Sequence, residues 1–331
     1  MRALVRGTEP PAGEYSFIVG PEDAGRRLDE FLELRFPWLS RIRLRAAVAH
    51  GRCFVNAERA DRGRRLVAGD SVHVWLNTSV PTGMWPEPIP VEVLYEDAWL
   101  AVVIKPAGML MHPTRNVKTG TLANALAWLW NPLLRDSERE RNAGPVIRPG
   151  FPHRLDRETS GLLVVAKNPT ALRHLSQAFS LRQVEKRYTA IVAGCVDLDE
   201  FEVNARIGHV PEEKPHWRVV EHGKPATTRM RVVKRHGGGS LIELEPLTGR
   251  THQLRIHCAH IGHPIVGDAL YGGPPAPRLC LHAAVLAFRH PETGRPLRFE
   301  SELPPEMQSC FEEMEQQCLG GSGNGGNDPL G

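Results

Sequence analysis

The chain of 331 residues lacks the long apolar stretch, the secretory leader and the paired cysteines that mark three large classes of protein. No apolar run approaches the roughly 18 residues that a membrane-spanning helix requires. Residues 1–6 do not begin an apolar segment of the kind that a signal peptide contains. The six cysteines are scattered without a C-x-x-C pair, which argues against both a disulfide framework and a zinc knuckle. We therefore expect a cytoplasmic protein with reduced thiols and no membrane contact.

A strong overall charge is also absent, because 41 lysines and arginines face 38 acidic residues and the formal net charge is only +3. The local distribution is less even, since residues 24–77 hold eleven arginines against six acidic residues. A basic face of this kind is typical of proteins that bind nucleic acid, although a charged face that is merely solvated would give the same composition. Local charge thus favours a nucleic-acid partner.

Composition divides the chain into four parts. Residues 17–77 combine two short helix patterns with later strands, which predicts a small α+β domain. Residues 78–90 contain four prolines and predict a semi-rigid linker. Residues 91–318 mix strand and helix patterns without a regular βα repeat, which predicts a mixed α+β sheet domain. Residues 319–331 are rich in glycine, serine and asparagine and predict a disordered tail.

The spacing of apolar residues predicts most elements of the large domain. We expect a helix at 121–130 and another that Asn168 caps. A short helix is expected at 252–260, with Thr251 as its cap. Residues 134–148 are polar and of mixed charge, which predicts an exposed loop. Strands are expected at 91–95, 100–104, 162–166, 187–193, 227–233 and 241–244.

The most informative segment of the chain is H-R-L-D-R-E-T-S-G-L-L-V-V-A-K at residues 153–167. It places one carboxylate, Asp156, between Arg154 and Arg157, just before a turn and a buried strand. A carboxylate on a tight turn at a strand edge is held rigidly and suits a nucleophile or a general base. The flanking guanidinium groups favour its ionised form and match phosphate oxygens in geometry. A surface turn with salt bridges would explain the same residues without any chemistry.

Further segments accompany this string in a fixed order. They are K-P-A-G-M-L-M-H-P at 105–113, E-K-R-Y-T-A at 185–190, L-T-G-R-T-H-Q-L-R-I-H at 247–257 and G-H-P-I-V-G-D at 262–268. Together with residues 153–167 they resemble the signature segments of the RluA family of pseudouridine synthases. The resemblance implies a mixed, largely antiparallel α+β catalytic domain of the pseudouridine synthase type, and an enzyme that isomerises uridines in RNA without a cofactor.

The resemblance also implies roles for four residues. Asp156 corresponds to the catalytic residue of the family, which attacks the ribose, attacks the base or acts as a base on the sugar. Arg154 is similar to the arginine that occupies the stack vacated by the flipped base. Tyr188 and Arg255 are similar to the active-site tyrosine and to the arginine that pairs with the aspartate. Flipping the uridine into such a pocket costs a few kcal/mol.

Residues 17–77 resemble an S4-type RNA-binding domain, because an R-L-D start, two helices and a late Gly-Asp turn before a strand follow one another. Ser40 is expected to cap the second helix, on which Arg41 and Arg45 lie four residues apart on one face. With Arg52 they are the candidate RNA-binding residues. Family members with this domain more often act on large-subunit ribosomal RNA, so the resemblance implies ribosomal RNA as substrate, with transfer RNA as the alternative.

A group of histidines with one cysteine at residues 252–263 suggests a different kind of site. Their spacing allows two or three metal ligands on one helical face. Arg255 lies among them and would repel a cation, and no cysteine pair completes a tetrahedral set, so we expect no metal. The residues concerned are His252, His257, Cys258, His260 and His263.

Other interpretations of the chemistry remain open from the residues alone. Asp156 and Glu158 could form an acid/base pair of the glycosidase type, although the basic surroundings oppose the raised pKa that the acid needs. Tyr188 could be a half-buried core tyrosine, and Arg255 a structural ion-pair partner. The chain could also be a non-catalytic RNA-binding protein, but it retains all three expected site residues. We expect a monomer whose partner is RNA.

Overall fold

The computed structural model describes residues 13–36, 39, 41–61, 63–76, 86–114, 116–131 and 147–321. The chain forms two compact units, one of Met1–Pro90 with His112–Pro149 and one of Val91–Met111 with Gly150–Gly331. The division predicted from composition stays a prediction. The predicted cap at Ser40, most of the predicted linker and loop, and the tail beyond Gly321 lie outside the described residues. None of the helices described is long and apolar enough to cross a membrane.

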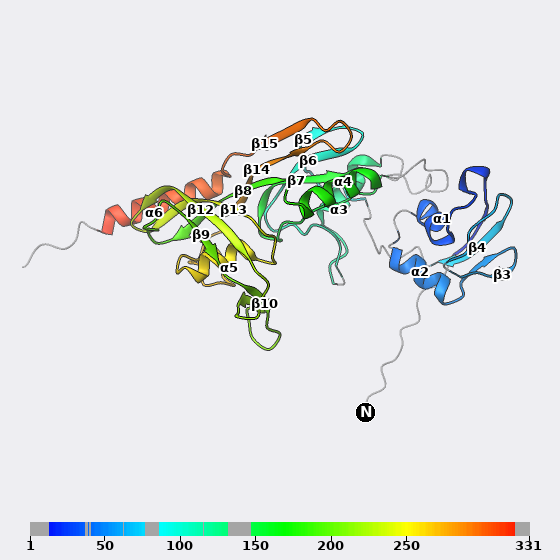
Figure 1. Ribbon diagram of the computed structural model, residues 1–331, viewed down its shortest axis with the longest axis horizontal. Coiled ribbons are helices and arrows are strands. Elements are labelled where there is room, and N and C mark those ends of the chain that lie inside the picture. Colours follow the sequence, from blue (N-terminus) through cyan, green and yellow to red (C-terminus); the bar gives the residue numbers. More distant parts are fainter. Residues whose placement is uncertain are drawn as a thin grey trace, which may run out of the picture. The chain divides into compact units, whose positions relative to one another are not determined.

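The first unit contains an antiparallel sheet in the order β1-β4-β2-β3 (Figure 1). Alternate residues of β4 point inward, so that Val72, Val74 and Leu76 pack against apolar side chains of the two helices. The helix patterns and strands predicted here are confirmed. The elements are β1 (Gly13–Ile18), a 3-10 helix η1 (Pro21–Asp23), α1 (Leu28–Arg35), α2 (Arg41–Ala49), β2 (Cys53–Val55), β3 (Glu58–Arg59) and β4 (Ser71–Leu76).

The same unit includes α3 (Leu122–Trp130), where the sequence predicts a helix at 121–130. The side chain of Thr121 accepts a hydrogen bond from the backbone N–H of Asn124 and so caps the first turn. Leu122 and Leu126 are buried, as expected for a helix that is apolar on most of its surface.

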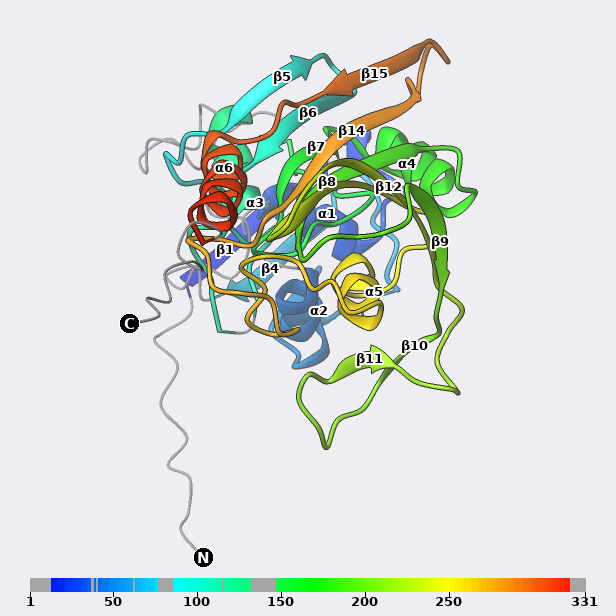
Figure 2. The ribbon, with the colours of Figure 1, turned by 90° about the vertical axis from the view of Figure 1, so that its left-hand side faces the viewer.

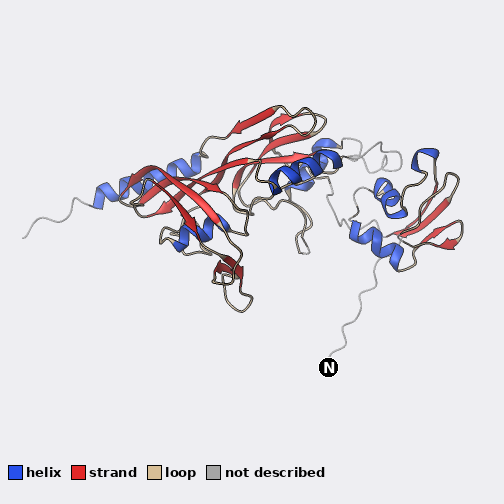
Figure 3. Cartoon of the chain, viewed as in Figure 1, coloured by secondary structure: helices blue, strands red, loops and turns tan. Residues whose placement is uncertain are grey.

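The second unit is built on a nine-stranded sheet in the order β5-β6-β7-β14-β8-β13-β12-β9, with β15 paired to β14 (Figure 1). Figure 3 shows its strands in red. Every pair is antiparallel except β7 with β14, which confirms the expected mixed, largely antiparallel α+β fold. The strands are β5 (Glu92–Glu96), β6 (Leu100–Lys105), β7 (Ser160–Ala166), β8 (Glu185–Ala193), β9 (Glu200–Asn204), β12 (Thr227–His236), β13 (Gly239–Pro246), β14 (Leu281–Arg289) and β15 (Pro296–Glu300).

Three helices and a hairpin accompany this sheet. Asn168 caps α4 (Pro169–Ser180), as predicted, by accepting a hydrogen bond from the N–H of Ala171 at 2.8 Å. In Figure 2, α5 (Gln253–His260) lies within the curve of the sheet, where it packs against β12 and β13. The hairpin is β10 (Ile207–His209) with β11 (Trp217–Val219), and the last helix is α6 (Pro305–Gly321).

The predicted cap of α5 is wrong. The cap of α5 is His252 and not Thr251, and its backbone adopts the left-handed conformation with φ 53°. This conformation costs free energy for a residue with a side chain, so contacts of the folded protein must offset it.

The start of β7 depends on a glycine. Gly161 has φ 114° and pairs with Ala283 where β7 and β14 run parallel. A Cβ atom at this position would lie 2.3 Å from the carbonyl oxygen of Ala283. No other residue type fits, because a side chain would clash with backbone and would also disfavour this φ. Gly161 therefore lets the start of β7, directly after the loop that carries Asp156, lie close against β14 in the middle of the sheet.

Beside the start of β7 lies a buried histidine. The Nδ1 of His282 lies 2.8 Å from Ser160 Oγ, and its Nε2 lies 3.0 Å from Ser301 Oγ. Arg278 donates a hydrogen bond to the same Ser160 hydroxyl. Burial and the charge of Arg278 lower the pKa of His282 to about 4. His282 is therefore neutral in the folded protein at neutral pH.

We expect the free energy of unfolding to fall as the pH is lowered from about 6.5 to about 4, because the unfolded chain then binds a proton at His282 that the folded chain does not. The full effect is on the order of 3 kcal/mol. Urea denaturation across this range measures it. His282→Gln should be less stable at neutral pH and should show a shallower pH dependence; an unchanged dependence would assign the acid sensitivity to other groups.

Candidate active site

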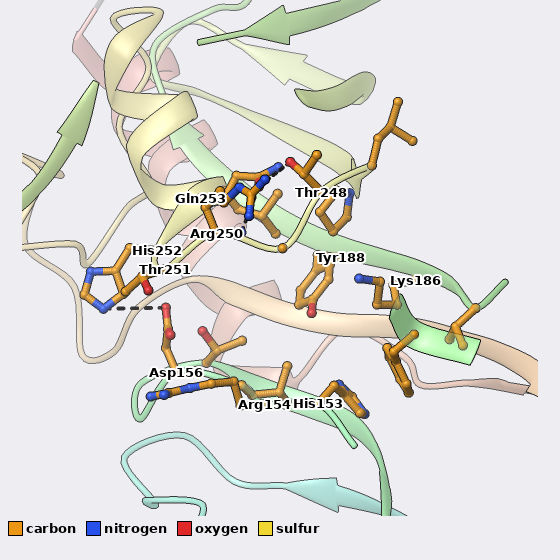
Figure 4. A pocket seen from close by; sticks show the side chains of 18 of the residues that line it. His153, Arg154, Asp156, Lys186, Tyr188, Thr248, Arg250, Thr251, His252 and Gln253 are labelled. Atoms are coloured by element: carbon orange, nitrogen blue, oxygen red, sulfur yellow. Dashed lines mark hydrogen bonds and ion pairs between the residues drawn. The ribbon is translucent and has the colours of Figure 1, made fainter. Parts of the chain in front are cut away.

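A cavity of about 780 Å³ lies in the second unit, and three of the signature segments line it. Its walls are the loop before β7, the end of α4, the start of β8 and the loop between β13 and α5 (Figure 4). The volume is within the range of small-ligand sites. Cationic side chains outnumber acidic ones in the lining, which favours an anionic ligand such as RNA. The charged lining residues are Arg154, Arg182, Lys186, Arg250, Arg255, Asp156 and Glu245.

Asp156 is in this cavity, with 23% of its side chain exposed. Its Oδ2 lies 3.8 Å from Nη1 of Arg255. The same oxygen lies 3.9 Å from Nε2 of His252, and a dashed line marks this pair in Figure 4. The N–H of Thr159 donates a hydrogen bond to the Asp156 carbonyl at 3.2 Å, which closes the tight turn that the sequence predicts. The carboxylate thus faces two basic groups across a short gap and remains accessible from the cavity.

Two basic residues, one buried and one partly buried, hold the loop that carries Asp156. Nζ of Lys105 donates hydrogen bonds to the carbonyl oxygens of Pro106, Met109 and Arg157, at 2.7, 2.9 and 3.0 Å. His153 accepts a hydrogen bond at Nε2 from the N–H of Val164. Burial and the charge of Lys186 lower the pKa of His153 to about 3, so its ring is neutral and available as an acceptor. Both ends of the loop are therefore fixed to the sheet.

Tyr188 projects into the cavity from β8 (Figure 4). Burial, together with the charge of Asp156, raises the pKa of its hydroxyl well above the usual range, so the phenol is protonated. Lys186 lies two residues earlier on the same face of the strand, which is the period of a β-strand. Burial lowers the pKa of Lys186, and its Nζ lies 5.8 Å from the centre of the Phe179 ring. The fourth expected residue, Arg154, is exposed and lines the cavity.

Sequence reasoning missed several members of the site. The sequence suggests His252 only as a metal ligand, yet it faces Asp156 from the same segment as Arg255. Lys186 could have been found from its spacing, because it lies two residues before Tyr188 and therefore on the same face of the strand. Asp268 has no role predicted from the sequence, although it belongs to a signature segment and accepts two hydrogen bonds from Arg255 at 2.7 Å.

The alternative sites look different in the structure. Glu158 is half exposed, lies 3.5 Å from the guanidinium of Arg157 and does not line the cavity, so it does not converge with Asp156. His257 is hydrogen bonded to Thr228 Oγ1 and to the Ala205 carbonyl. In the part of the chain that the structure describes, no group of three histidine, cysteine or acidic residues could hold a metal ion.

The candidate RNA-binding arginines belong to the first unit, whereas the residues that line the cavity belong to the second. Nη2 of Arg45 forms an ion pair with the buried carboxylate of Asp29 at 3.1 Å, and 47% of the Arg45 side chain is exposed. Arg52 is exposed. The side chain of Arg41 lies outside the described residues, so its predicted role stays a prediction.

Comparison with known proteins identifies the family. Residues 100–260 match the family model described as RNA pseudouridylate synthase. A protein of Aquifex aeolicus described as an uncharacterized RNA pseudouridine synthase is 37% identical over 309 residues, which cover 89% of this chain and 96% of that protein. The chain belongs to the RNA pseudouridylate synthase family. The family predicted from the signature segments is thereby confirmed.

Other relatives of this synthase have more specific names. The ribosomal large subunit pseudouridine synthase D of Xanthomonas campestris pv. campestris is 35% identical over 328 residues, covering 94% of this chain and 96% of that protein. A solved human structure, RNA pseudouridylate synthase domain containing 1, superimposes with a TM-score of 0.54 at 25% identity and covers 74% of this chain and 98% of that one. These comparisons confirm the predicted fold class and enzyme class, while the S4 resemblance of residues 17–77 stays a prediction.

Proposed function

We propose that this synthase converts uridines of large-subunit ribosomal RNA to pseudouridine, with Asp156 as the catalytic carboxylate. The observation that carries the proposal is the position of Asp156, accessible in the cavity within 4 Å of two basic side chains. The name of the Xanthomonas relative supports ribosomal RNA over transfer RNA. A ribosomal substrate implies work in the cytoplasm, and one chain supplies every group that the reaction requires, so a monomer suffices.

The reaction is an isomerisation without net oxidation or reduction. The bond between N1 of uracil and C1′ of the ribose breaks, a bond between C5 and C1′ forms, C5 loses a proton and N1 gains one. Asp156 would act on the ribose or on the base while the detached uracil turns. Tyr188 presents an apolar ring on which the flipped base can stack. Arg255 would stabilise the charge of Asp156, and Arg154 would fill the space that the base leaves in the RNA.

The test is to map pseudouridine in RNA that the pure protein has treated. Unmodified transcripts of large-subunit ribosomal RNA and of transfer RNA are incubated without metal or nucleotide, labelled with carbodiimide and reverse transcribed. Stops at defined positions in ribosomal RNA are the expected result. Stops only in transfer RNA would keep the enzyme class and reject the substrate. Tight binding without stops in any transcript would favour a non-catalytic RNA-binding protein.

The first unit is proposed to bind RNA phosphates through its arginines. We expect the double substitution of Arg45 and Arg52 by methionine to weaken RNA binding and to make its dependence on salt shallower. The slope of log K against log salt should decrease in magnitude by about 0.7–0.9 for each phosphate that is no longer bound. Filter binding at several salt concentrations measures the slope. Arg289→Met, which replaces an exposed arginine of β14, is the matched control and should leave the slope unchanged. An unchanged slope in the double variant would reject these contacts.

A further inference from the structure

Behind the cavity, the segment 265–273 contacts two of the groups that face Asp156. Asp268 contacts Arg255, and Tyr271 contacts His252, while neither Asp268 nor Tyr271 lines the cavity itself. We propose that Asp268 is a positioning residue of the synthase, which orients Arg255 toward Asp156 and keeps its charge compensated during the reaction. The inference rests on the proposed function of Asp156.

The geometry of the guanidinium group makes this orientation specific. Nε and Nη2 of Arg255 donate to Oδ2 and Oδ1 of Asp268, both at 2.7 Å. A guanidinium group is planar and rigid, so fixing one edge by two parallel hydrogen bonds fixes the direction of the remaining nitrogen. That nitrogen, Nη1, is the one that lies 3.8 Å from Asp156 Oδ2. Asp268 thus fixes the position of Arg255 Nη1 relative to the carboxylate of Asp156.

Asp268 is itself held firmly. Its side chain is completely buried, and Oδ1 also accepts hydrogen bonds from the N–H groups of Leu270 and Tyr271. The preceding residue, Gly267, has φ 79°, and a Cβ atom there would lie 1.9 Å from the carbonyl oxygen of Arg278. The backbone around Asp268 is therefore tightly packed, and its carboxylate has little freedom to move.

The charges explain why a second carboxylate is useful. Only 9% of the Arg255 side chain is exposed, and a buried cation without a partner is costly. Burial opposes the charge of Arg255, but the hydrogen bonds and charge of Asp268, together with Asp156, raise its pKa. Asp156 loses its negative charge whenever it bonds to the substrate or takes a proton. Asp268 takes no part in those steps, so Arg255 keeps one ionic partner throughout the reaction.

Tyr271 extends the same support to His252. Its ring lies under the guanidinium of Arg255, at 5.1 Å from ring centre to Cζ. Its hydroxyl donates to the carbonyl oxygen of Trp217 at 3.1 Å and lies 2.9 Å from Nδ1 of His252. Since that hydroxyl hydrogen is already used, His252 donates from Nδ1, and its Nε2 is the atom that faces Asp156. This contact is one of those that hold His252 in its left-handed backbone conformation.

The first experiment replaces Asp268 with asparagine, which has the same shape and no charge. We expect kcat on the ribosomal transcript to fall about 100-fold, as for a misplaced catalytic group, while the Kd for RNA stays within about twofold. Asp97→Asn is the matched control, because Asp97 accepts hydrogen bonds from Tyr95, Trp99 and Leu100 in the same unit but does not line the cavity. It should lower stability and leave kcat of the folded protein unchanged.

A double-mutant cycle separates positioning from a merely structural role. If Asp268 acts through Arg255, Asp268→Asn should change kcat less than about threefold once Arg255→Met is present. Arg255→Lys covers the case in which Asp268→Asn does not fold, because lysine cannot bond Asp268 with two parallel N–H groups and should lose a similar part of kcat. Additive losses in the cycle, or a wild-type kcat in Arg255→Lys, would overturn the inference. Full activity in Asp268→Asn beside an inactive Asp156→Asn would reject the inference alone, whereas an active Asp156→Asn would reject the proposed function.

Discussion

Replacing Asp156 with asparagine is expected to lower the rate of pseudouridine formation by at least about 10³-fold and to leave RNA affinity nearly unchanged. Asparagine has the shape of aspartate, but it can neither attack the ribose or base nor accept a proton in the way that a carboxylate does. The loop is held by hydrogen bonds from Lys105 to the Arg157 carbonyl, from the N–H of Val164 to His153 and from the N–H of Thr159 to the Asp156 carbonyl. None of them involves the Asp156 side chain. The fold of the site should therefore survive the substitution.

The measurement for Asp156→Asn is tritium release from RNA labelled at C5 of uridine, because the reaction breaks that C–H bond. Glu158→Gln is the matched control, since Glu158 lies on the same loop, is half exposed and is paired with Arg157. Its rate should stay close to that of the natural protein. More than a tenth of normal turnover in Asp156→Asn would reject the catalytic assignment. An inactive Glu158→Gln variant would instead favour a mechanism in which Asp156 and Glu158 act together.

Lys105→Met is expected to lower the free energy of unfolding by about 3–5 kcal/mol. Lys105 is fully buried in the structure, and its three N–H groups satisfy three backbone carbonyls. Burial lowers its pKa to about 8, while the charges of Glu158 and Asp156 oppose that shift. Methionine fills the volume and leaves all three carbonyls without a donor. One of them belongs to Arg157, next to Asp156, so kcat should fall as well.

Urea denaturation of Lys105→Met and of the natural protein measures the difference. Lys234→Met serves as the matched control, because Lys234 is half exposed and its ion pair with Glu315 lies on the surface. Exposed pairs of this kind contribute about 0–1 kcal/mol. A loss below about 1 kcal/mol in Lys105→Met would show that water or other groups satisfy the carbonyls, and that the lysine does not hold the loop.

Local sequence patterns predicted the elements that depend on neighbouring residues. Asn168 caps α4 as expected, because a capping side chain bonds an N–H group only two or three residues away. The predicted start of α5 is wrong for the opposite reason. Its cap, His252, is held by the hydroxyl of Tyr271, nineteen residues later in the chain. No pattern within the helix itself signals such a contact.

The candidate site shows the same division. The signature segments predicted Asp156, Arg154, Tyr188 and Arg255, and the structure has all four lining one cavity. Their catalytic roles stay predictions. The sequence suggested Asp156 as the partner of Arg255, whereas the closest carboxylate in the structure is Asp268, at 2.7 Å against 3.8 Å for Asp156. Which carboxylate is closer depends on the loop after α5, because this loop places Asp268 against Arg255.

The sequence by itself determined the chemical groups that this synthase can use and the order in which they occur, because each signature segment is a local string whose residue types carry its chemistry. Only the tertiary structure decided how those groups are supported. Lys105 donates a hydrogen bond to the carbonyl of Arg157, 52 residues later in the chain, and Ser160 is hydrogen bonded to His282, 122 residues later. Such pairings arise from strand order and close packing, which depend on the whole chain and not on any one segment.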